Sequence, residues 1–191
     1  MELILASTSP YRRQLLERLG LPFRCVAPGV DEEAVRQPAW IPEEVALHLA
    51  RLKAEAVASR LPDAFVIGSD QVAECAGQVL GKPGHRMGAM AQLSLLAGKP
   101  HYLWTAVAFA TAGEVSVQLN CTRLTMRSLT ATEIERYLDA DQPWDCAGSY
   151  KLESRGIALF ESIETDDSTA IIGLPLIAVT TALRGHGFTV P

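Results

Sequence analysis

The sequence predicts an α/β protein built around a mixed β-sheet. Short apolar runs, of the length expected for buried strands, alternate with longer segments in which apolar residues recur at the period of an amphipathic helix. Two pairs of the strand-like runs are joined by glycine turns, which adds hairpins to the strand–helix units. The chain has 191 residues, 48% of them hydrophobic and 20% charged, so it can bury a sizeable core and is too apolar for wholesale disorder.

The N-terminal half is expected to fold as strand–helix units followed by a hairpin. An apolar run at 3–6 leads into Ser7, Ser9 and Pro10, which predict a helix start because serine hydroxyls cap helices and proline fits the first turn. That helix should end before Gly20. The elements expected after it are a strand at 23–27, a helix from 41 to Pro62, a buried strand at 65–68 that ends at 69–71, and a hairpin at 72–80 that turns at Gly77.

The C-terminal half is expected to contain a second hairpin between helices. A helix at 87–97 should stop at Gly98, and strands at 102–110 and 115–125 should be joined by a turn at Gly113. Thr130 with Glu133 three residues later is typical of a capping box, which predicts a helix that ends near 139. The last helix is expected at 176–183.

The charge balance limits the partners of the chain. Seventeen Lys and Arg residues against 22 Asp and Glu residues give a net charge of −5, and the basic residues form no block. Neither a nucleic acid nor an anionic membrane surface is therefore expected as a partner. No apolar stretch reaches the roughly 18 residues of a membrane span, and the N-terminus lacks the pattern of a secretory signal, so a cytoplasmic protein is expected.

The start of the first predicted helix is a candidate anion site. Arg12 and Arg13 occupy its first turn, although cations there oppose the helix dipole by about 0.3–1 kcal/mol each. A phosphate bound by backbone N–H groups, the hydroxyls of Ser7 and Ser9 and the guanidinium groups would compensate. A solvated helix end with arginines paired to nearby acids explains the same residues equally well, so the pattern alone leaves both interpretations open.

Acidic and basic side chains elsewhere could complete such a site. Asp70 follows a predicted buried strand, the usual place of active-site groups in an α/β sheet, where it could activate water or bind a metal. A single aspartate there is more often a turn former. The acidic stretch 31–33 could add metal ligands or start a helix. Lys53 and Lys82 are candidates for the site only in combination with these groups. The histidines show no H-x-x-x-H spacing and the cysteines no C-x-x-C pair, so zinc sites are not expected.

Seven short motifs together resemble the Maf family of nucleoside triphosphate pyrophosphatases. Each motif is weak alone, but they occur in order over nearly the whole chain. They lie at 7–13, 30–32, 52–54, 67–71, 81–83, 146–150 and 172–176. The resemblance implies a two-lobed Maf-like fold, similar to that of ITPases, with a central cleft. It implies a single Maf-like domain over residues 1–191 and allows a homodimer.

The resemblance also implies a reaction and the residues that perform it. Water would hydrolyse a nucleoside triphosphate between its α- and β-phosphates, giving the monophosphate and pyrophosphate, with Asp70 as the proton acceptor. The cofactor would be Mg²⁺ or Mn²⁺, with Glu33 and Asp70 as candidate ligands. The phosphate-binding residues would be Ser7, Ser9, Arg12, Arg13, Lys53 and Lys82.

Three further positions are candidates for selecting the base. The family motif usually has arginine where Tyr11 stands, and Tyr11 together with Glu153 is similar to the Maf members that hydrolyse 7-methyl-GTP. Methylation at N7 makes guanine cationic, so it would stack well on Tyr11, and Glu153 could accept hydrogen bonds from N1–H and the N2 amine. Gln71 is the third position. Tyr11 could instead pack on its own helix, and Glu153 could be a surface acid.

Two other functions stay open on the sequence. One is the dTTP/UTP pyrophosphatase activity of the broader family, against which Tyr11 and Glu153 argue. The other is a non-catalytic nucleotide-binding regulator, because the family is also associated with restraint of cell division. Release of pyrophosphate from a panel of nucleotides distinguishes them.

Overall fold

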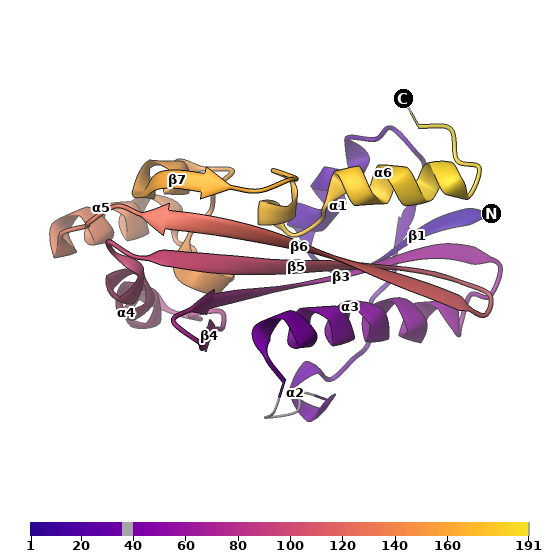
Figure 1. The fold of residues 1–191 in the computed structure, drawn as a ribbon, viewed down its shortest axis with the longest axis horizontal. Helices are drawn as coiled ribbons and strands as arrows, with labels where there is room; N and C mark the ends of the chain where they lie inside the picture. The colour runs from indigo at the N-terminus through magenta and orange to yellow at the C-terminus, as the bar shows by residue number, and fades with distance from the viewer. Residues whose placement is uncertain (36–39, 191) are drawn as a thin grey trace. The chain divides into compact units, whose positions relative to one another are not determined.

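A computed structural model describes residues 1–35 and 40–190 and confirms the mixed α/β fold (Figure 1). The strands form one sheet in the order β2-β1-β3-β5-β6-β7, and β4 pairs with β3. In the part of the chain that is described, no helix has the length and apolar character needed to cross a membrane. The strands are β1 (Glu2–Ala6), β2 (Arg24–Cys25), β3 (Ala64–Cys75), β4 (Gln78–Leu80), β5 (Pro100–Thr111), β6 (Glu114–Met126) and β7 (Phe160–Glu164).

Among the described residues, the α-helices agree with the sequence-based expectation in number and place, apart from one short addition. That addition is α2, one turn that contains two acids of the 31–33 stretch. The α-helices are α1 (Pro10–Glu17), α2 (Glu32–Val35), α3 (Pro42–Ala58), α4 (Arg86–Leu96), α5 (Ala131–Asp141) and α6 (Leu176–Gly185), and the 3₁₀ helices are η1 (Ala147–Ser149), η2 (Arg155–Leu159) and η3 (Ala170–Ile172).

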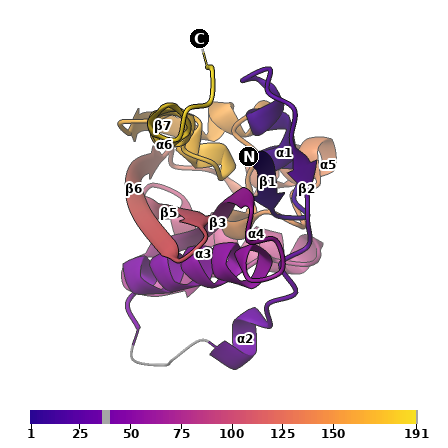
Figure 2. The ribbon, with the colours of Figure 1, turned by 90° about the vertical axis from the view of Figure 1, so that its right-hand side faces the viewer.

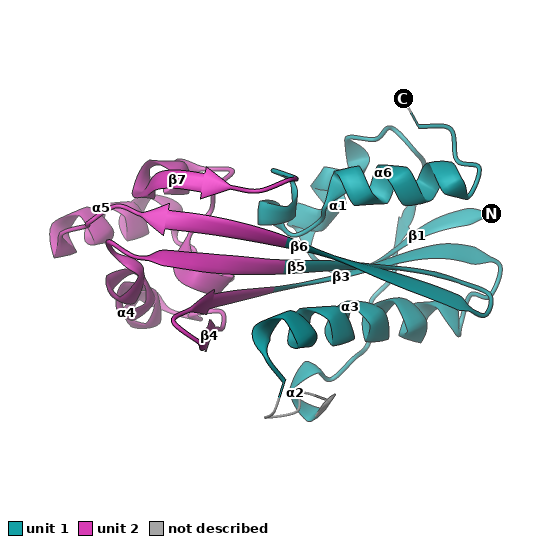
Figure 3. Cartoon of the chain, in the orientation of Figure 1, with its two compact units in different colours: residues 1–71, 105–120, 167–191 teal, residues 72–104, 121–166 magenta. Residues whose placement is uncertain are grey.

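The chain divides into two compact units (Figure 3). Unit 1 consists of residues 1–71, 105–120 and 167–191, and unit 2 of residues 72–104 and 121–166. The strands β3, β5 and β6 each contribute residues to both units. Neither unit is therefore one continuous stretch of sequence.

In unit 1, helices cover both faces of the strands. Figures 1 and 2 show α1 and α6 on one face and α3 on the other. β1 and β3 run parallel with Leu3 opposite Phe65 and Leu5 opposite Ile67. These four side chains belong to the buried cluster that also contains apolar residues of α1 and α6. Because side chains alternate along a strand, the residues between them face α3.

Close packing of α3 on β3 requires a glycine. A Cβ atom on Gly68 would lie 2.5 Å from the backbone oxygen of Ala50 and 2.6 Å from the backbone nitrogen of Ala54. Real Cβ atoms do not come that close to backbone, so only glycine admits the helix at this distance. Gly68 thereby lets α3 approach the stretch of β3 that precedes Asp70.

Unit 2 contains the β3–β4 hairpin, α4, α5 and a buried aromatic group. The fully buried His101 lies 3.0 Å, through its Nε2, from the hydroxyl of Tyr150, and both rings lie against Phe160. The predicted capping box at the start of α5 is present, with Thr130 and Glu133 bonding each other's backbone N–H groups. The hairpin predicted at 72–80 is confirmed, with β3 and β4 antiparallel across the turn that contains Gly77.

Two strand boundaries were predicted wrongly. β3 does not end at 69–71 but continues to Cys75, so Asp70 lies inside a strand. The polar residues looked like a loop, yet Ser69 and Asp70 are both buried and hydrogen-bonded. β2 has two residues rather than the five expected at 23–27, because its pairing with β1 extends over only two positions.

Candidate active site

The loop between β1 and α1 is folded around its two serines. Ser9 is the N-cap of α1, and its Oγ accepts the backbone N–H of Arg12 at 3.4 Å, while Pro10 begins the helix. Ser7 is buried, and its Oγ accepts the backbone N–H of Ser9 at 3.1 Å. A hydroxyl that accepts an N–H still has its own hydrogen to donate. Capping the helix is thus compatible with binding an anion at the same place.

The two arginines of the first turn have different surroundings. Arg12 is partly buried, and its Nε donates to the backbone oxygen of Gly173 at 2.9 Å, which leaves the Nη groups of the fork for another acceptor. Arg13 is exposed, and its Nε lies 2.9 Å from Oε1 of Glu17 one turn later. An exposed pair at this spacing contributes only about 0.3–0.5 kcal/mol. Arg12 is therefore held in place, whereas Arg13 can change partner at little cost.

Lys53 lies between two carboxylates. Its Nζ is 2.6 Å from Oδ1 of Asp70 on β3 and 2.6 Å from Oε1 of Glu32 on α2. Lys53 and Asp70 are each only 6% exposed, whereas the side chain of Glu32 is about half exposed at 47%. Lys53 follows Ala50 on α3 by three residues and Asp70 follows Gly68 on β3 by two, so the close contact at Gly68 also brings this pair together.

The surroundings of Asp70 affect its basicity in two directions. Burial raises the pKa of Asp70 above its ordinary value, and the positive charges of Lys53 and Arg12 oppose that rise. Burial also lowers the pKa of Arg12, and the charges of Asp70 and Glu32 oppose that change. A carboxylate with a raised pKa is a better proton acceptor, and adjacent cations favour its ionised form. This combination suits a general base.

The backbone oxygen of Gly173 connects two elements of the site. It accepts Nε of Arg12 at 2.9 Å and lies 2.8 Å from the hydroxyl of Ser69, the residue before Asp70. Gly173 has φ +112°, a conformation that favours glycine, and a Cβ there would lie 3.2 Å from Nε of Arg12. In the sequence, Gly173 stands out only as part of the motif at 172–176. Its role comes from a contact between residues 161 positions apart, which local sequence does not reveal.

Gln71 has its side-chain nitrogen directed into unit 1. Its Nε2 lies 2.9 Å from the hydroxyl of Thr105, 2.9 Å from the backbone oxygen of Ala170 and 3.0 Å from that of Ile171. The two hydrogens on this nitrogen thus have acceptors within the chain. Gln71 holds the segment around η3 in place, and in this arrangement it does not present its amide nitrogen to a base.

The structure places the remaining predicted residues as follows. Tyr11 is partly buried on α1, and Glu33 is exposed on α2, where its neighbour Glu32 is the acid that contacts Lys53. Lys82 is exposed in the loop after β4, and Glu153 is exposed in the turn between η1 and η2. Lys82 and Glu153 belong to unit 2, and the other predicted site residues belong to unit 1.

The donor set around Asp70 is compatible with a hard divalent cation that also binds a phosphate substrate. Within residues 1–35 and 40–190, no group of three or more His, Cys, Asp or Glu side chains gathers closely enough to hold a metal ion. Asp70 and Glu32 both direct oxygens at one point, which Lys53 fills. Mg²⁺ is commonly bound by one or two carboxylates together with substrate phosphates and water, so two carboxylates suffice.

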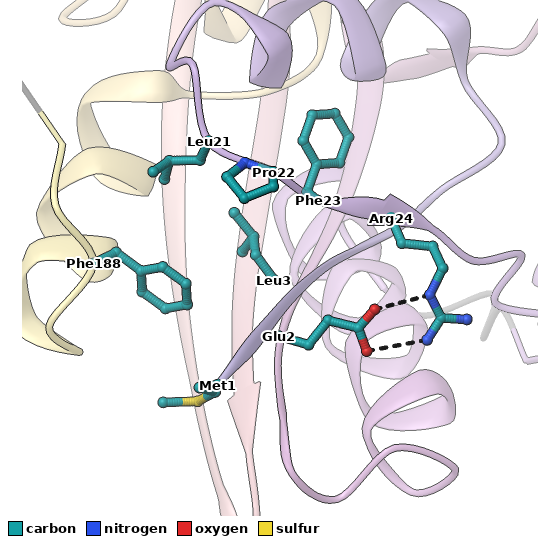
Figure 4. Close-up of a pocket in the computed structure, with 8 residues that line it drawn as sticks. All are labelled: Met1, Glu2, Leu3, Leu21, Pro22, Phe23, Arg24 and Phe188. Carbon is teal, nitrogen blue, oxygen red and sulfur yellow. Dashed lines mark hydrogen bonds and ion pairs between the residues drawn. The ribbon is translucent and has the colours of Figure 1, made fainter.

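A pocket of about 460 Å³ lies at the other end of β1 (Figure 4). Its walls are mainly apolar, with Leu21 and Phe188 among them, and a two-pronged ion pair between Glu2 and Arg24 closes one side. Because a strand rises about 3.3 Å per residue, the two ends of β1 are roughly 13 Å apart. The pocket is therefore separate from the polar groups that follow β1.

Known proteins resemble the chain over its whole length. A Xanthomonas oryzae pv. oryzae protein (strain MAFF 311018) named 7-methyl-GTP pyrophosphatase is 52% identical over 189 residues, covering 99% of this chain and 98% of that protein. Proteins of the same name from Albidiferax ferrireducens and Aromatoleum aromaticum are each 48% identical. They cover 99% and 100% of this chain, and the matches span 95% and 98% of their own lengths.

A solved structure and a family model complete the comparison. The Staphylococcus aureus Ham1 protein has a TM-score of 0.56 and 14% identity, covering 97% of this chain and 100% of that one, which shows a shared fold. Residues 2–186 match the model of the Maf-like proteins. The motifs that carried the resemblance lie within this range, and the chain belongs to the Maf family.

Proposed function

We propose that the chain is a nucleoside triphosphate pyrophosphatase that hydrolyses 7-methyl-GTP to 7-methyl-GMP and pyrophosphate. The observation that carries the proposal is the buried Asp70, paired with Lys53 near the capped start of α1. This arrangement places a proton acceptor among cations, which is what hydrolysis of a polyphosphate requires. Relatives about 50% identical over nearly the whole chain bear the name of this activity.

Asp70 is proposed to accept the proton of the attacking water. As the water oxygen bonds to phosphorus, its proton passes to the carboxylate, the α–β phosphoanhydride bond breaks, and pyrophosphate leaves with the electron pair of that bond. The raised pKa of Asp70 increases its affinity for the proton, and Lys53 at 2.6 Å keeps it ionised beforehand. Lys53 can then turn to the phosphates, since its three N–H donors suit several acceptors.

The phosphates are proposed to bind at the start of α1. The Nη groups of Arg12 and the hydroxyls of Ser7 and Ser9 supply donors there, and the helix N-terminus favours negative charge. Arg13 is proposed to join them by leaving Glu17. Lys82 of unit 2 is proposed to contact the triphosphate as well, on the strength of the family resemblance.

A divalent cation, Mg²⁺ or Mn²⁺, is proposed as cofactor. Asp70 and Glu32 would hold it, and Glu33 stays a further candidate ligand because it lies next to Glu32 on the one-turn helix α2. When bound, such an ion would neutralise phosphate charge and raise the acidity of a coordinated water.

The base is proposed to be read by Tyr11 and Glu153. A cationic 7-methylguanine gains from stacking on an aromatic ring, and its N1–H and N2 amine match the two acceptor oxygens of a carboxylate. For Gln71 we propose an indirect role in specificity, through the segment at Ala170 and Ile171 that its amide holds.

The test is release of pyrophosphate from 7-methyl-GTP, GTP, dTTP and UTP by wild type and by Asp70→Asn. The variant keeps the size of the side chain but loses the base, so kcat should fall at least about 100-fold while KM changes little. A wild type that prefers dTTP or UTP would contradict the proposed substrate. A wild type that binds nucleotides without hydrolysing them, or an active Asp70→Asn, would contradict the proposed reaction.

A further inference from the structure

The turn that bears Glu153 is tied to helix α5 on both sides of that residue. Before it, the backbone N–H of Lys151 donates to the hydroxyl oxygen of Tyr137 at 2.9 Å. After it, the hydroxyl of Ser154 donates to Oδ1 of Asp141 at 3.1 Å, and the backbone N–H of Arg155 donates to Oδ2 at 3.0 Å. Three hydrogen bonds therefore fix the backbone on which Glu153 stands, although its own side chain is exposed.

The two anchors occupy one face of a firmly formed helix. Tyr137 and Asp141 are four residues apart on α5, a spacing that aligns side chains. The capping box at Thr130 and Glu133 secures the start of the helix, and Gln142 in the left-handed conformation ends it directly after Asp141. The anchors thus belong to an element with both ends defined, whereas the residue that they hold lies in a turn.

Asp141 is an unusual residue for its position unless it serves the turn. A carboxylate in the last turn of a helix faces the negative end of the helix dipole, which is unfavourable. Its side chain is also only 1% exposed, so the charge is removed from water. Both of its oxygens accept hydrogen bonds from the turn after Glu153, and these bonds compensate for the lost hydration of the carboxylate. The nearby guanidinium of Arg155, at 3.4 Å, is itself 69% exposed.

Asp139, on the same helix, provides the contrast. It lies two residues before Asp141, its side chain is 66% exposed, and it forms an ion pair with Arg86 on α4. Both aspartates therefore lie in the last turn of the same helix, two residues apart. They differ in burial, and only Asp141 holds the turn of Glu153.

We propose that Asp141, together with Tyr137, is a positioning residue for base recognition: it fixes the turn at 151–155 so that the carboxylate of Glu153 meets the base in one orientation. The inference rests on the proposed function, since it takes Glu153 as the residue that reads guanine. A carboxylate can match two donors of one base edge only if its backbone is held, because a displacement of about 0.5 Å already weakens such a constellation.

The test measures binding of the reaction products, which no catalytic step complicates. Isothermal titration calorimetry gives the Kd of 7-methyl-GMP and of UMP for wild type, Asp141→Ala, the matched control Asp139→Ala and the milder Tyr137→Phe. We expect Asp141→Ala to reduce the preference for 7-methyl-GMP about tenfold, the effect of losing well-placed hydrogen bonds to the base. Tyr137→Phe should reduce it less, and Asp139→Ala should leave it unchanged.

A rescue and a double variant separate positioning from general damage to the fold. In Asp141→Asn, the amide oxygen can accept the N–H of Arg155 while its nitrogen donates to the hydroxyl of Ser154, so the preference should return to within about twofold of wild type. In a chain that carries Glu153→Gln, the further change Asp141→Ala should have no additional effect on the preference, because the residue it positions has already lost its function.

The outcomes that overturn the inference differ from those that overturn the proposed function. The inference fails if Asp141→Ala keeps the wild-type preference, if it weakens both nucleotides equally, or if its effect adds to that of Glu153→Gln. The proposed function fails if the wild type releases no pyrophosphate from 7-methyl-GTP, a result that leaves the binding comparison intact.

Discussion

At the scale of single residues, the site depends on partners that lie far apart in the sequence. Ser69 bonds to the oxygen of Gly173, 104 positions later, and Gln71 to that of Ala170, 99 positions later. These contacts allow a run of three polar residues to continue a buried strand, because each side chain replaces its lost water with a partner in the chain. The strength of Asp70 as a base follows from the same burial, since burial raises its pKa.

His101 makes the stability of unit 2 sensitive to acid. Burial lowers its pKa from 6.5 to about 4. Between pH 6.5 and 4, His101 is therefore protonated in the unfolded chain but neutral in the folded chain. The contribution of His101 to the free energy of unfolding thus decreases as the pH falls through this range. The full loss, reached near pH 4, is about 3 kcal/mol.

Replacing His101 tests this assignment. His101→Gln keeps a polar partner for the hydroxyl of Tyr150 but does not titrate. Urea unfolding at several pH values from 7 to 4 should show a free energy of unfolding that falls less steeply with acid in the variant than in wild type. The carboxylates titrate in both chains, so the difference between the curves reports His101. Parallel curves would show that this histidine accepts its proton in the folded state without penalty.

Local sequence predicted the helix caps but not the composition of the site. Ser9, Pro10, Thr130 and Glu133 act through neighbours within three residues, so their roles were visible in the sequence and are confirmed. The acid that contacts Lys53 could not be identified from local sequence. Glu32 and Glu33 are neighbours on one turn of helix, so their side chains point in different directions. Only the packing of α2 determines that Glu32 contacts Lys53.

At the scale of elements, the site depends on the packing of α3 against β3. α3 carries Lys53 and β3 carries Asp70, and the two elements touch at Gly68. The sequence predicted both elements and placed a glycine at the end of the apolar run. It did not reveal that this glycine is a contact point, because the atoms that exclude a Cβ belong to α3. The continuation of β3 through residues 69–71 was missed for a related reason, since the partners of Ser69 and Gln71 lie 104 and 99 positions away.

Gly68→Ala should separate these two elements. Its Cβ would lie 2.5–2.9 Å from backbone and side-chain atoms of Ala50 and Ala54, and overpacking of this kind costs about 1–3 kcal/mol or more. We expect a lower free energy of unfolding in urea, and a lower kcat because Lys53 moves from Asp70.

The matched control is Gly185→Ala near the end of α6, where no heavy atom lies within 4 Å of the new Cβ. It should be neutral or slightly stabilising. Equal stability of the two variants would show that α3 can shift without cost.

At the scale of the whole molecule, the path of the chain links the two units. The chain passes from one unit to the other after residues 71, 104, 120 and 166, and β3, β5 and β6 each run through such a point. A unit whose pieces are separated in sequence must close long loops before it can form, which costs entropy that only the rest of the chain can offset. The sequence alone, with its single set of motifs from one end to the other, led to the expectation of one domain over residues 1–191.

Unfolding should therefore be a single cooperative transition of both units, and the tryptophans allow each unit to be followed separately. Trp40 stacks on His48 in unit 1, with ring centroids 4.2 Å apart, whereas Trp104 and Trp144 belong to unit 2. The double variant Trp104→Phe/Trp144→Phe leaves fluorescence from unit 1, and Trp40→Phe leaves it from unit 2. In urea, each variant should give a fluorescence midpoint and m-value that coincide with those from its own far-ultraviolet circular dichroism, as two-state unfolding requires.

If fluorescence from unit 2 changed at a lower urea concentration than the circular dichroism of the same variant, unit 2 would unfold while unit 1 stays folded. The shared strands would then not couple the units, and residues 1–191 would have to be treated as two domains.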